Sequence, residues 1–371
     1  MKIGIVLDPN LRIPGGVQEH CRGLYDALES LGQEVVIIAC GQKGEEDWER
    51  NVALLGNIFE LRFLGRAASA PFTWQTLQKI RQFLDKERFD VLNFEGPGGL
   101  FSWEVLALSK TINVLTFHIY PGALDLFWFG LPVLPVIRFL NRKFSGRIAV
   151  SPVAADYAQK FYPGKYEIIP NGVDLSRFSS EGAKVEKFRD DKVKILFVGR
   201  LDPRKGILHL LIAYQQLTTK FANLCLMVVG DGPQREKALG FVRKNKLKNV
   251  EFLGKVSSEK LPECFRTADI YCSPALYGES FGIVLIEAMA SGLPIVVYAN
   301  EGYKRVLRKK PFCDFLVKPG DVKGLAKSLE ILIKDRGLRK SLGEGGLKEA
   351  KNYDWKKIGR QTLEFYREVA G

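Results

Sequence analysis

Two carboxylates, Glu279 and Glu287, stand eight residues apart at the start and in the middle of an apolar run that extends from Phe281 to Ala290. A segment that is apolar on all sides predicts a buried helix, and Ser291-Gly292-Leu293-Pro294 is a typical helix end. A carboxylate inside such a helix needs a partner, because an unpaired buried charge is costly. A basic side chain or the diol of a bound ligand would serve. A structural ion pair could explain either glutamate alone, but the two together favour a ligand site.

Three further side chains follow predicted strands. Arg200 and Lys205 lie in a glycine-containing loop between a strand and a helix, where two fixed positive charges could hold a diphosphate. His118 directly follows an apolar strand, and ligands of open α/β sheets gather at the carboxyl ends of strands. A lone histidine can equally be structural, and its place at a strand end favours the site.

Glycine loops provide the weaker signals. Gly15 and Gly16 precede a predicted helix, so its first N–H groups could bind a phosphate. The segment Gly230-Asp231-Gly232 begins like a dinucleotide fingerprint, but Arg235 stands where the third glycine belongs. That substitution argues against a dehydrogenase.

The elements that must position these residues alternate between strand and helix in two series, which predicts two doubly wound α/β domains with parallel sheets. A polar stretch from Ser179 to Asp191 separates the two series. Helices are expected at 17–31, 72–83, 281–290 and 355–369, and strands at 3–6, 34–38, 89–94, 113–117, 147–151, 167–174, 193–198, 224–229, 250–256, 295–297 and 314–317.

The stretch Glu279-Ser280-Phe281-Gly282 with Glu287 resembles the E-x7-E motif of retaining glycosyltransferases of family 4, which have the GT-B fold. The longer string, with Arg305-Val306-Leu307 and Tyr353-Asp354-Trp355, most resembles bacterial phosphatidylinositol mannosyltransferases. The resemblance extends over essentially the whole chain, and the loop from Gly199 to Gly206 matches the family's G-R-x-x-x-x-K-G element.

This resemblance implies two facing Rossmann-like domains with the active site in the cleft between them. Residues 1–178 would form the acceptor-side domain, with the helix at about 355–371 packing back on it, and residues 179–354 would bind the nucleotide sugar. The implied catalytic residues are His118, Glu279, Arg200 and Lys205. The implied donor-binding residues also include Gly15, Gly16, Gly254, Lys255, Val256, Ser280, Phe281, Gly282, Ile283 and Glu287.

The reaction that the resemblance implies is transfer of a hexose, mannose from GDP-mannose, to a lipid such as phosphatidylinositol. A UDP-sugar donor, another lipid or polysaccharide acceptor, and a nucleotide-sugar epimerase or phosphorylase on the same fold remain alternatives. The nucleotide sugar is a co-substrate, and no permanent cofactor is expected. Because the chain has no Asp-x-Asp pair, a protein-held metal is not expected either.

The charge of +13 requires either an anionic partner or an explanation in terms of solubility, and no nucleic-acid-binding motif accompanies it. The helix at 72–83 has an apolar stripe that includes Trp74, Leu77 and Ile80, flanked by Lys79, Arg81, Lys86 and Arg88. The aromatic segment 120–144 closes with Arg138, Arg142 and Lys143. Both features suit an anionic lipid surface, although a basic amphipathic helix can also simply pack on a core.

Composition and cysteine spacing suggest the compartment. Hydrophobic residues make up 46% of the chain and charged residues 26%, as in a globular protein. The six cysteines form no C-x-x-C pair, which favours reduced thiols. The chain opens on a predicted strand rather than a signal peptide, and the apolar stretch 126–137 is too short to span a bilayer. We therefore expect a cytoplasmic protein that associates peripherally with the inner face of the membrane.

Overall fold

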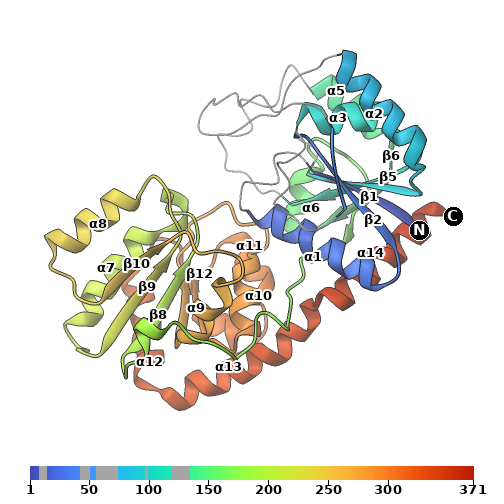
Figure 1. Cartoon of the computed structure of the whole chain (residues 1–371). Helices are drawn as coiled ribbons and strands as arrows, with labels where there is room; N and C mark the ends of the chain where they lie inside the picture. Colours follow the sequence, from blue (N-terminus) through green and yellow to red (C-terminus); the bar gives the residue numbers. More distant parts are fainter. Residues whose placement is uncertain (8–14, 42–50, 56–73, 97–98, 119–133) are drawn as a thin grey trace. The chain divides into compact units, whose positions relative to one another are not determined.

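The computed structural model describes residues 1–7, 15–41, 51–55, 74–96, 99–118 and 134–371 (Figure 1). The chain divides into two compact units, one formed by residues 1–172 with 355–371 and the other by residues 173–354. Most of the aromatic segment expected at 120–144 lies outside the described residues.

The first unit is built on a parallel sheet with the order β3-β2-β1-β4-β5-β6-β7 among the described residues. Its central strands are apolar and largely buried, as expected when helices cover both faces of a parallel sheet. They are β1 (Lys2–Leu7), β2 (Glu34–Ala39), β3 (Val52–Leu54), β4 (Val91–Glu95), β5 (Ile112–Phe117), β6 (Phe144–Ala149) and β7 (Glu167–Ile168).

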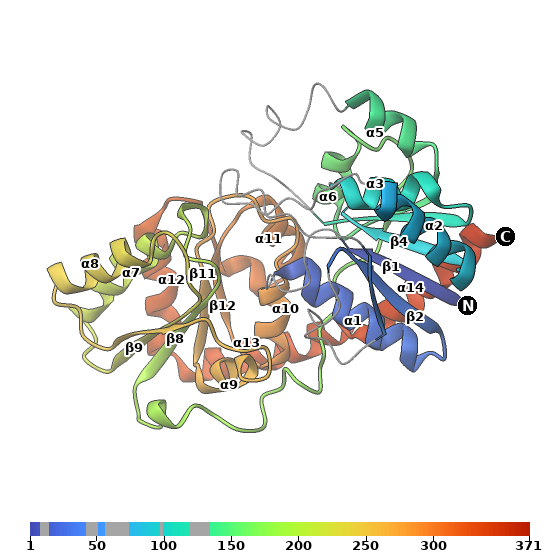
Figure 2. The same ribbon diagram turned by 45° about the horizontal axis from the view of Figure 1, so that its top comes forward.

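Helices cover both faces of this sheet (Figures 1 and 2). The described helices are α1 (Gly16–Ser30), α2 (Trp74–Glu87), α3 (Leu100–Leu108), α5 (Leu134–Asn141), α6 (Pro152–Ala158) and α14 (Trp355–Ala370). On one face α14 packs along α1, and on the other α3 contacts both α2 and α5. The last residues of the chain therefore complete the core of the first unit, where Ile358, Leu363 and Tyr366 are buried with β1 and α1.

The second unit has a parallel sheet with the order β10-β9-β8-β11-β12-β13. On one face α7 packs against α8 and α12, and elsewhere α10 packs against α13 (Figure 1). The strands are β8 (Val193–Val198), β9 (Leu224–Val229), β10 (Val250–Gly254), β11 (Ile270–Ser273), β12 (Ile295–Tyr298) and β13 (Leu316–Val317). The helices are α7 (Ile207–Thr218), α8 (Arg235–Lys244), α9 (Leu261–Thr267), α10 (Ile283–Ala290), α11 (Glu301–Val306), α12 (Val322–Lys334) and α13 (Arg336–Ala350), and 3-10 turns occupy 186–188, 203–205, 312–315 and 351–353.

The prediction of two doubly wound α/β domains is confirmed. In each sheet the strand order reverses at one point, between β1 and β4 in the first and between β8 and β11 in the second. Open α/β sheets bind ligands beyond the carboxyl ends of the strands at such a point. The loops that follow these four strands are therefore the places to look for a site.

Several details of the sequence-based assignment were wrong, among them the strand expected at 167–174, which is a strand only at Glu167–Ile168. The strand expected at 314–317 is a strand only at Leu316–Val317, because the amide of Asp314 bonds to the carbonyl of Pro311 in a 3-10 turn. The short strands β3 and β11 were not predicted. Trp74 does not share the buried stripe of α2: it is the first residue of the helix and is 73% exposed, whereas Ile80 is fully buried.

Candidate active site

The helix that carries Glu287, α10, lies in the interior of the second unit. Glu287 is 7% exposed, and Leu285, Ile286, Ala288 and Met289 around it on α10 are fully buried, which confirms the predicted buried helix. Gly282 precedes the helix with a φ of 94°, a left-handed conformation that favours glycine. A Cβ at this position would lie 2.5 Å from the Tyr303 ring, so both space and backbone conformation require the glycine.

Glu279, just before this helix, forms an ionic cluster with the loop that follows β8. The Lys205 ammonium lies 2.6 Å from Glu279 Oε1, and the Arg204 guanidinium lies 3.4 Å from the same oxygen. Arg204 also donates to the carbonyl oxygen of Gly278 at 2.9 Å. The cluster therefore joins the two loops that flank the strand-order reversal between β8 and β11.

Tight backbone packing holds these two loops together. Gly206, which ends the 3-10 turn of the β8 loop, has a φ of 72°, and a Cβ there would lie 2.1 Å from the carbonyl oxygen of Pro274. The Asp202 side chain caps the turn by accepting from the amide of Lys205 at 3.2 Å. Lys205 is thus placed by a capped turn and a close backbone contact.

The other residues of the second unit that were predicted to bind the donor lie at the same edge of this sheet. Arg200 is exposed in the β8 loop, and Gly254 ends β10 with its carbonyl accepting from the amide of Gly230 at 2.7 Å. Lys255 is exposed and Val256 partly buried after β10. Ser280 and Ile283 are partly buried at the start of α10, and the Phe281 ring packs against Tyr353 with a centroid distance of 5.8 Å.

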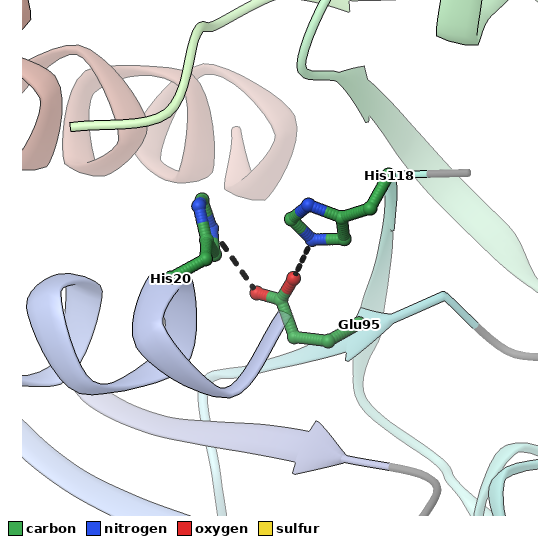
Figure 3. Close-up of side chains that lie close together, drawn as sticks. All are labelled: His20, Glu95 and His118. Atoms are coloured by element: carbon green, nitrogen blue, oxygen red, sulfur yellow. Dashed lines mark hydrogen bonds and ion pairs between the residues drawn. The ribbon is translucent and has the colours of Figure 1, made fainter. Parts of the chain in front are cut away.

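In the first unit, His118 is part of a buried cluster that the sequence analysis did not anticipate (Figure 3). His118 directly follows β5, and its Nε2 atom is hydrogen-bonded to Oε2 of Glu95, the last residue of β4. His20 on α1 approaches the same carboxylate, with 3.7 Å between its Nε2 and Glu95 Oε1. Glu95 is fully buried, and the two histidines are 4% and 8% exposed.

Neighbouring side chains fix the orientation of these three. Asn93 donates to Glu95 Oε1 at 2.6 Å, and the Thr116 hydroxyl donates to Asn93 Oδ1 at 2.7 Å. On the other side, Nδ1 of His20 lies 2.8 Å from Asn171 Oδ1. The cluster therefore collects residues from α1, β4, β5 and the segment after β7 at the strand-order reversal of the first sheet.

Trp355, the first residue of α14, closes this arrangement from the C-terminal end of the chain. Its indole contacts the His20 ring edge to face, with 5.2 Å between centroids. It fits between Gly23 of α1 and Gly172, where added Cβ atoms would lie 2.0 and 2.4 Å from indole atoms. The close contact of α14 with α1 therefore depends on glycines.

Burial determines the protonation of the cluster. It raises the pKa of Glu95 to about 7, against the opposing effects of His20 and the Asn93 hydrogen bond. Burial also lowers the pKa of His20 to about 4 and that of His118 to about 3. Near neutral pH both imidazoles are therefore uncharged, and Glu95 is the group that gains or loses a proton.

The same three residues are also of the types that hold a metal ion, and one ligand atom from each lies within 4.8 Å of the others. Ligands around a tetrahedral zinc ion are about 3.3 Å apart, given metal–ligand bonds of 2.0–2.1 Å. The Glu95 carboxylate instead bonds directly to His118 (Figure 3). This geometry is that of a hydrogen-bonded pair rather than of two ligands of one ion.

Gly15 and Gly16 begin α1, one turn before His20, and Gly15 is its extended N-cap residue. Both glycines are exposed, as a phosphate-binding position requires. Sequence reasoning overlooked His20, Glu95 and Arg204. The available signals were a carboxylate at the end of a predicted strand, a histidine one turn into the glycine-initiated helix, and a second cation beside Lys205.

Comparison with known protein families gives matches over almost the whole chain. Residues 14–177 match the model described as Glycosyltransferase Family 4, and residues 179–349 match the one described as Glycosyl transferases group 1. The chain is 33% identical to a phosphatidyl-myo-inositol mannosyltransferase of Mycobacterium leprae, over 100% of this chain and 97% of the relative. It is 30% identical to the protein of the same name from Propionibacterium freudenreichii, over 100% and 96%.

Among solved structures, the fold is similar to that of Anabaena Alr3699/HepE in complex with UDP and glucose. The TM-score is 0.80 with 20% sequence identity, over 99% of this chain and 100% of that one. The sucrose-phosphate synthase of Thermosynechococcus elongatus has a TM-score of 0.76 with 22% identity, over 99% and 98%. At these identities the likeness establishes the fold.

Proposed function

This chain is a glycosyltransferase of family 4 with the GT-B fold, and we propose that it transfers mannose from GDP-mannose to a phosphatidylinositol-type lipid with retention of anomeric configuration. The mycobacterial and propionibacterial relatives, which are matched along their whole length, carry the name of that activity. The observation in the structure that carries the proposal is the meeting of Lys205, Arg204 and Glu279 at the carboxyl edge of the second sheet.

The proposal gives each part of this cluster a role in breaking the glycosidic bond. The Lys205 ammonium, together with Arg200 and Arg204, would neutralise the charge that develops on the departing diphosphate. Glu279 would then exchange its bond to Lys205 for the hydroxyls of the donor sugar, at the point where positive charge builds on the anomeric carbon. The N–H groups from Ser280 to Ile283, which lead into α10, would bind phosphate oxygens.

Two further sets of residues would hold the rest of the donor. Glu287 would accept hydrogen bonds from the ribose hydroxyls. The base would stack against the backbone of Gly254, Lys255 and Val256. Gly254 allows the base to approach closely because it has no side chain. The structure of Alr3699/HepE in complex with UDP-glucose makes a UDP-sugar the donor to test beside GDP-mannose.

The first unit would bind the acceptor. His118 would contact the reacting hydroxyl of the acceptor. Gly15 and Gly16 would accommodate the phosphates that approach the start of α1. His118 lies at the strand-order reversal of its own sheet, where such folds bind ligands.

A lipid acceptor requires contact with a membrane, and the first unit offers suitable side chains for peripheral contact. Trp74 on α2 is 73% exposed and Phe139 on α5 is 66% exposed, and Lys79 and Arg138 on the same two helices are also exposed. Aromatic rings beside cations suit the headgroup region of an anionic bilayer. Within the described part of the chain, no helix is both long and apolar enough to cross a bilayer. From these exposed rings and cations, we propose that the protein associates peripherally with the inner face of the membrane.

Two measurements test the function. Purified protein is first titrated with GDP, UDP, GDP-mannose and UDP-glucose while its thermal unfolding is followed. A true donor at a hundred times its Kd stabilises the fold by about 2.7 kcal/mol. The stabilising sugar nucleotide is then incubated with phosphatidylinositol vesicles, and the anomeric configuration of the glycolipid is read by NMR.

We expect an α-mannosyl lipid that forms only with GDP-mannose and phosphatidylinositol together. Stabilisation by UDP-glucose alone would refute the choice of donor. Glycosylation of a soluble glycan but not of the lipid would refute the choice of acceptor. Conversion of the donor without any acceptor would identify an epimerase.

A further inference from the structure

Glu95 is a fully buried carboxylate that the transfer reaction, as proposed, does not use. Among the residues that the structure describes, the titratable groups that face it are His20 and Cys21 on α1, His118 after β5, and Tyr366 on α14. None of these groups is a lysine or an arginine. Burying a carboxylate among neutral partners costs folding free energy, so its presence at the site calls for an explanation.

The two carboxylate oxygens of Glu95 have different hydrogen-bond partners. Thr116 donates to Asn93 Oδ1, which turns the amide NH2 of Asn93 toward Glu95 Oε1. Oε1 therefore accepts from Asn93 in either protonation state. The other oxygen, Oε2, faces Nε2 of His118 (Figure 3).

The state of Oε2 then determines the tautomer of His118. When Glu95 is ionised, His118 must donate its Nε2–H to the carboxylate, and Nδ1 is left without hydrogen. When Glu95 is protonated, its O–H can donate to Nε2, and the ring hydrogen is then carried by Nδ1. The pair takes up one proton from solvent in this change: the Nε2 hydrogen passes to the carboxylate, and the new proton binds Nδ1.

We propose that Glu95 is a positioning residue that keeps Nδ1 of His118 a hydrogen-bond acceptor for the reacting hydroxyl of the acceptor substrate. This inference depends on the role of His118 in the proposed function. A hydroxyl that attacks an anomeric carbon donates its hydrogen as it does so, and an imidazole nitrogen that bears hydrogen cannot receive it.

The pKa of Glu95, about 7, places the switch within the working pH range of a cytoplasmic enzyme. Above it the ionised carboxylate predominates and His118 has the active tautomer. Below it the pair holds one more proton and His118 has the inactive one. Turnover should therefore fall by about tenfold per pH unit below about pH 7, as expected for one titrating group.

The test is Glu95→Gln, which keeps the shape and removes the titration. The amide oxygen of the glutamine replaces Oε1 as the acceptor for Asn93, so its NH2 must donate to His118 Nε2 and lock the ring hydrogen on Nδ1. Between about pH 5.5 and 8.5 we expect the turnover of this variant to be flat and at least about tenfold below wild type at the upper limit, with the KM for the sugar nucleotide changed by less than about twofold.

Glu104→Gln is the matched control, because Glu104 is another buried glutamate of the first unit, on α3. It should retain the wild-type pH profile. Thermal unfolding of both variants at each pH establishes that the loss is not unfolding. Separately, 15N NMR of the free protein at about pH 8.5 should show Nδ1 of His118 without hydrogen in wild type and with hydrogen in Glu95→Gln.

An unchanged pH step in Glu95→Gln, or the same His118 tautomer in both proteins, would overturn the proposal. So would restoration by zinc of activity that a chelator had removed from wild type, since His20, Glu95 and His118 would then be metal ligands. The NMR measurement needs neither donor nor acceptor substrate, so a wrong assignment of the reaction would leave its result standing.

Discussion

Two glycine-to-alanine changes should have opposite effects on stability, although both lie inside helices. Gly240 on α8 has open space where a Cβ would stand, and Gly23 on α1 has the Trp355 indole there, 2.0 Å away. In a helix interior, alanine is favoured over glycine by about 1 kcal/mol. Gly240→Ala should gain most of that amount.

Gly23→Ala gains the same helix propensity but must displace the indole. The indole cannot simply shift away, because Gly172 leaves no more room on its other side, where a Cβ would lie 2.4 Å from it. Overpacking costs about 1–3 kcal/mol, and a contact this short belongs near the upper end of that range. After the gain in helix propensity is subtracted, the net loss of stability is about 1–2 kcal/mol. The difference between the two variants should be about 2–3 kcal/mol.

Urea unfolding measures the change in stability of each variant, and hydrogen exchange shows which helices are affected. With a slope of about 2 kcal/mol per molar urea, the Gly23→Ala midpoint falls by about 0.5–1 M. Amides of α1 and α14 should lose protection, while those of α8 should not. Because Trp355 contacts His20, turnover should also fall, with nucleotide binding unchanged. If Gly23→Ala stabilised the protein as much as Gly240→Ala, the packing of α14 on α1 through Trp355 would be refuted.

Three further predictions concern substrate and membrane binding. Replacing both Arg200 and Lys205 by alanine should abolish donor use without unfolding the protein; calorimetric binding of the sugar nucleotide at wild-type affinity would remove the diphosphate site from this loop. His118→Ala should lower kcat more than donor affinity, and equal losses in steady-state kinetics and in binding would reduce His118 to a structural role. In vesicle sedimentation, binding should need anionic lipid and weaken with salt. Binding should lose up to about 4 kcal/mol when four exposed cations are changed to glutamine, namely Lys79, Arg81, Lys86 and Arg88. Indifference of the wild type to anionic vesicles would refute the lipid-surface proposal.

Some of this architecture could be predicted from the sequence because it is local. The apolar run from Phe281 to Ala290 predicted a buried helix, which the structure has at Ile283–Ala290, and β8 and β9 have the bounds that their apolar residues indicate. These features depend on neighbouring residues only. The strands β3 and β11 were not predicted: β3 has only three residues, and both strands exist because β2 and β8 beside them offer hydrogen-bonding partners.

The candidate sites show the same division. The resemblance to family 4 singled out Lys205 and Glu279, but only the fold revealed that their side chains meet and that Arg204 joins them. The family motif marks residue types at a spacing along the chain. It contains no information on which two loops the sheet brings together.

The buried cluster of the first unit was decided by the tertiary structure alone. His20, Glu95 and His118 come from three separate segments, and Asn171 and Trp355 from two more. The carboxyl ends of β4 and β5 are neighbours because those strands pair in parallel, and α1 reaches them because β1 pairs with β4. Strand order is set by the packing of the whole sheet, so a carboxylate at the end of one predicted strand gives no sign of the histidines it will meet.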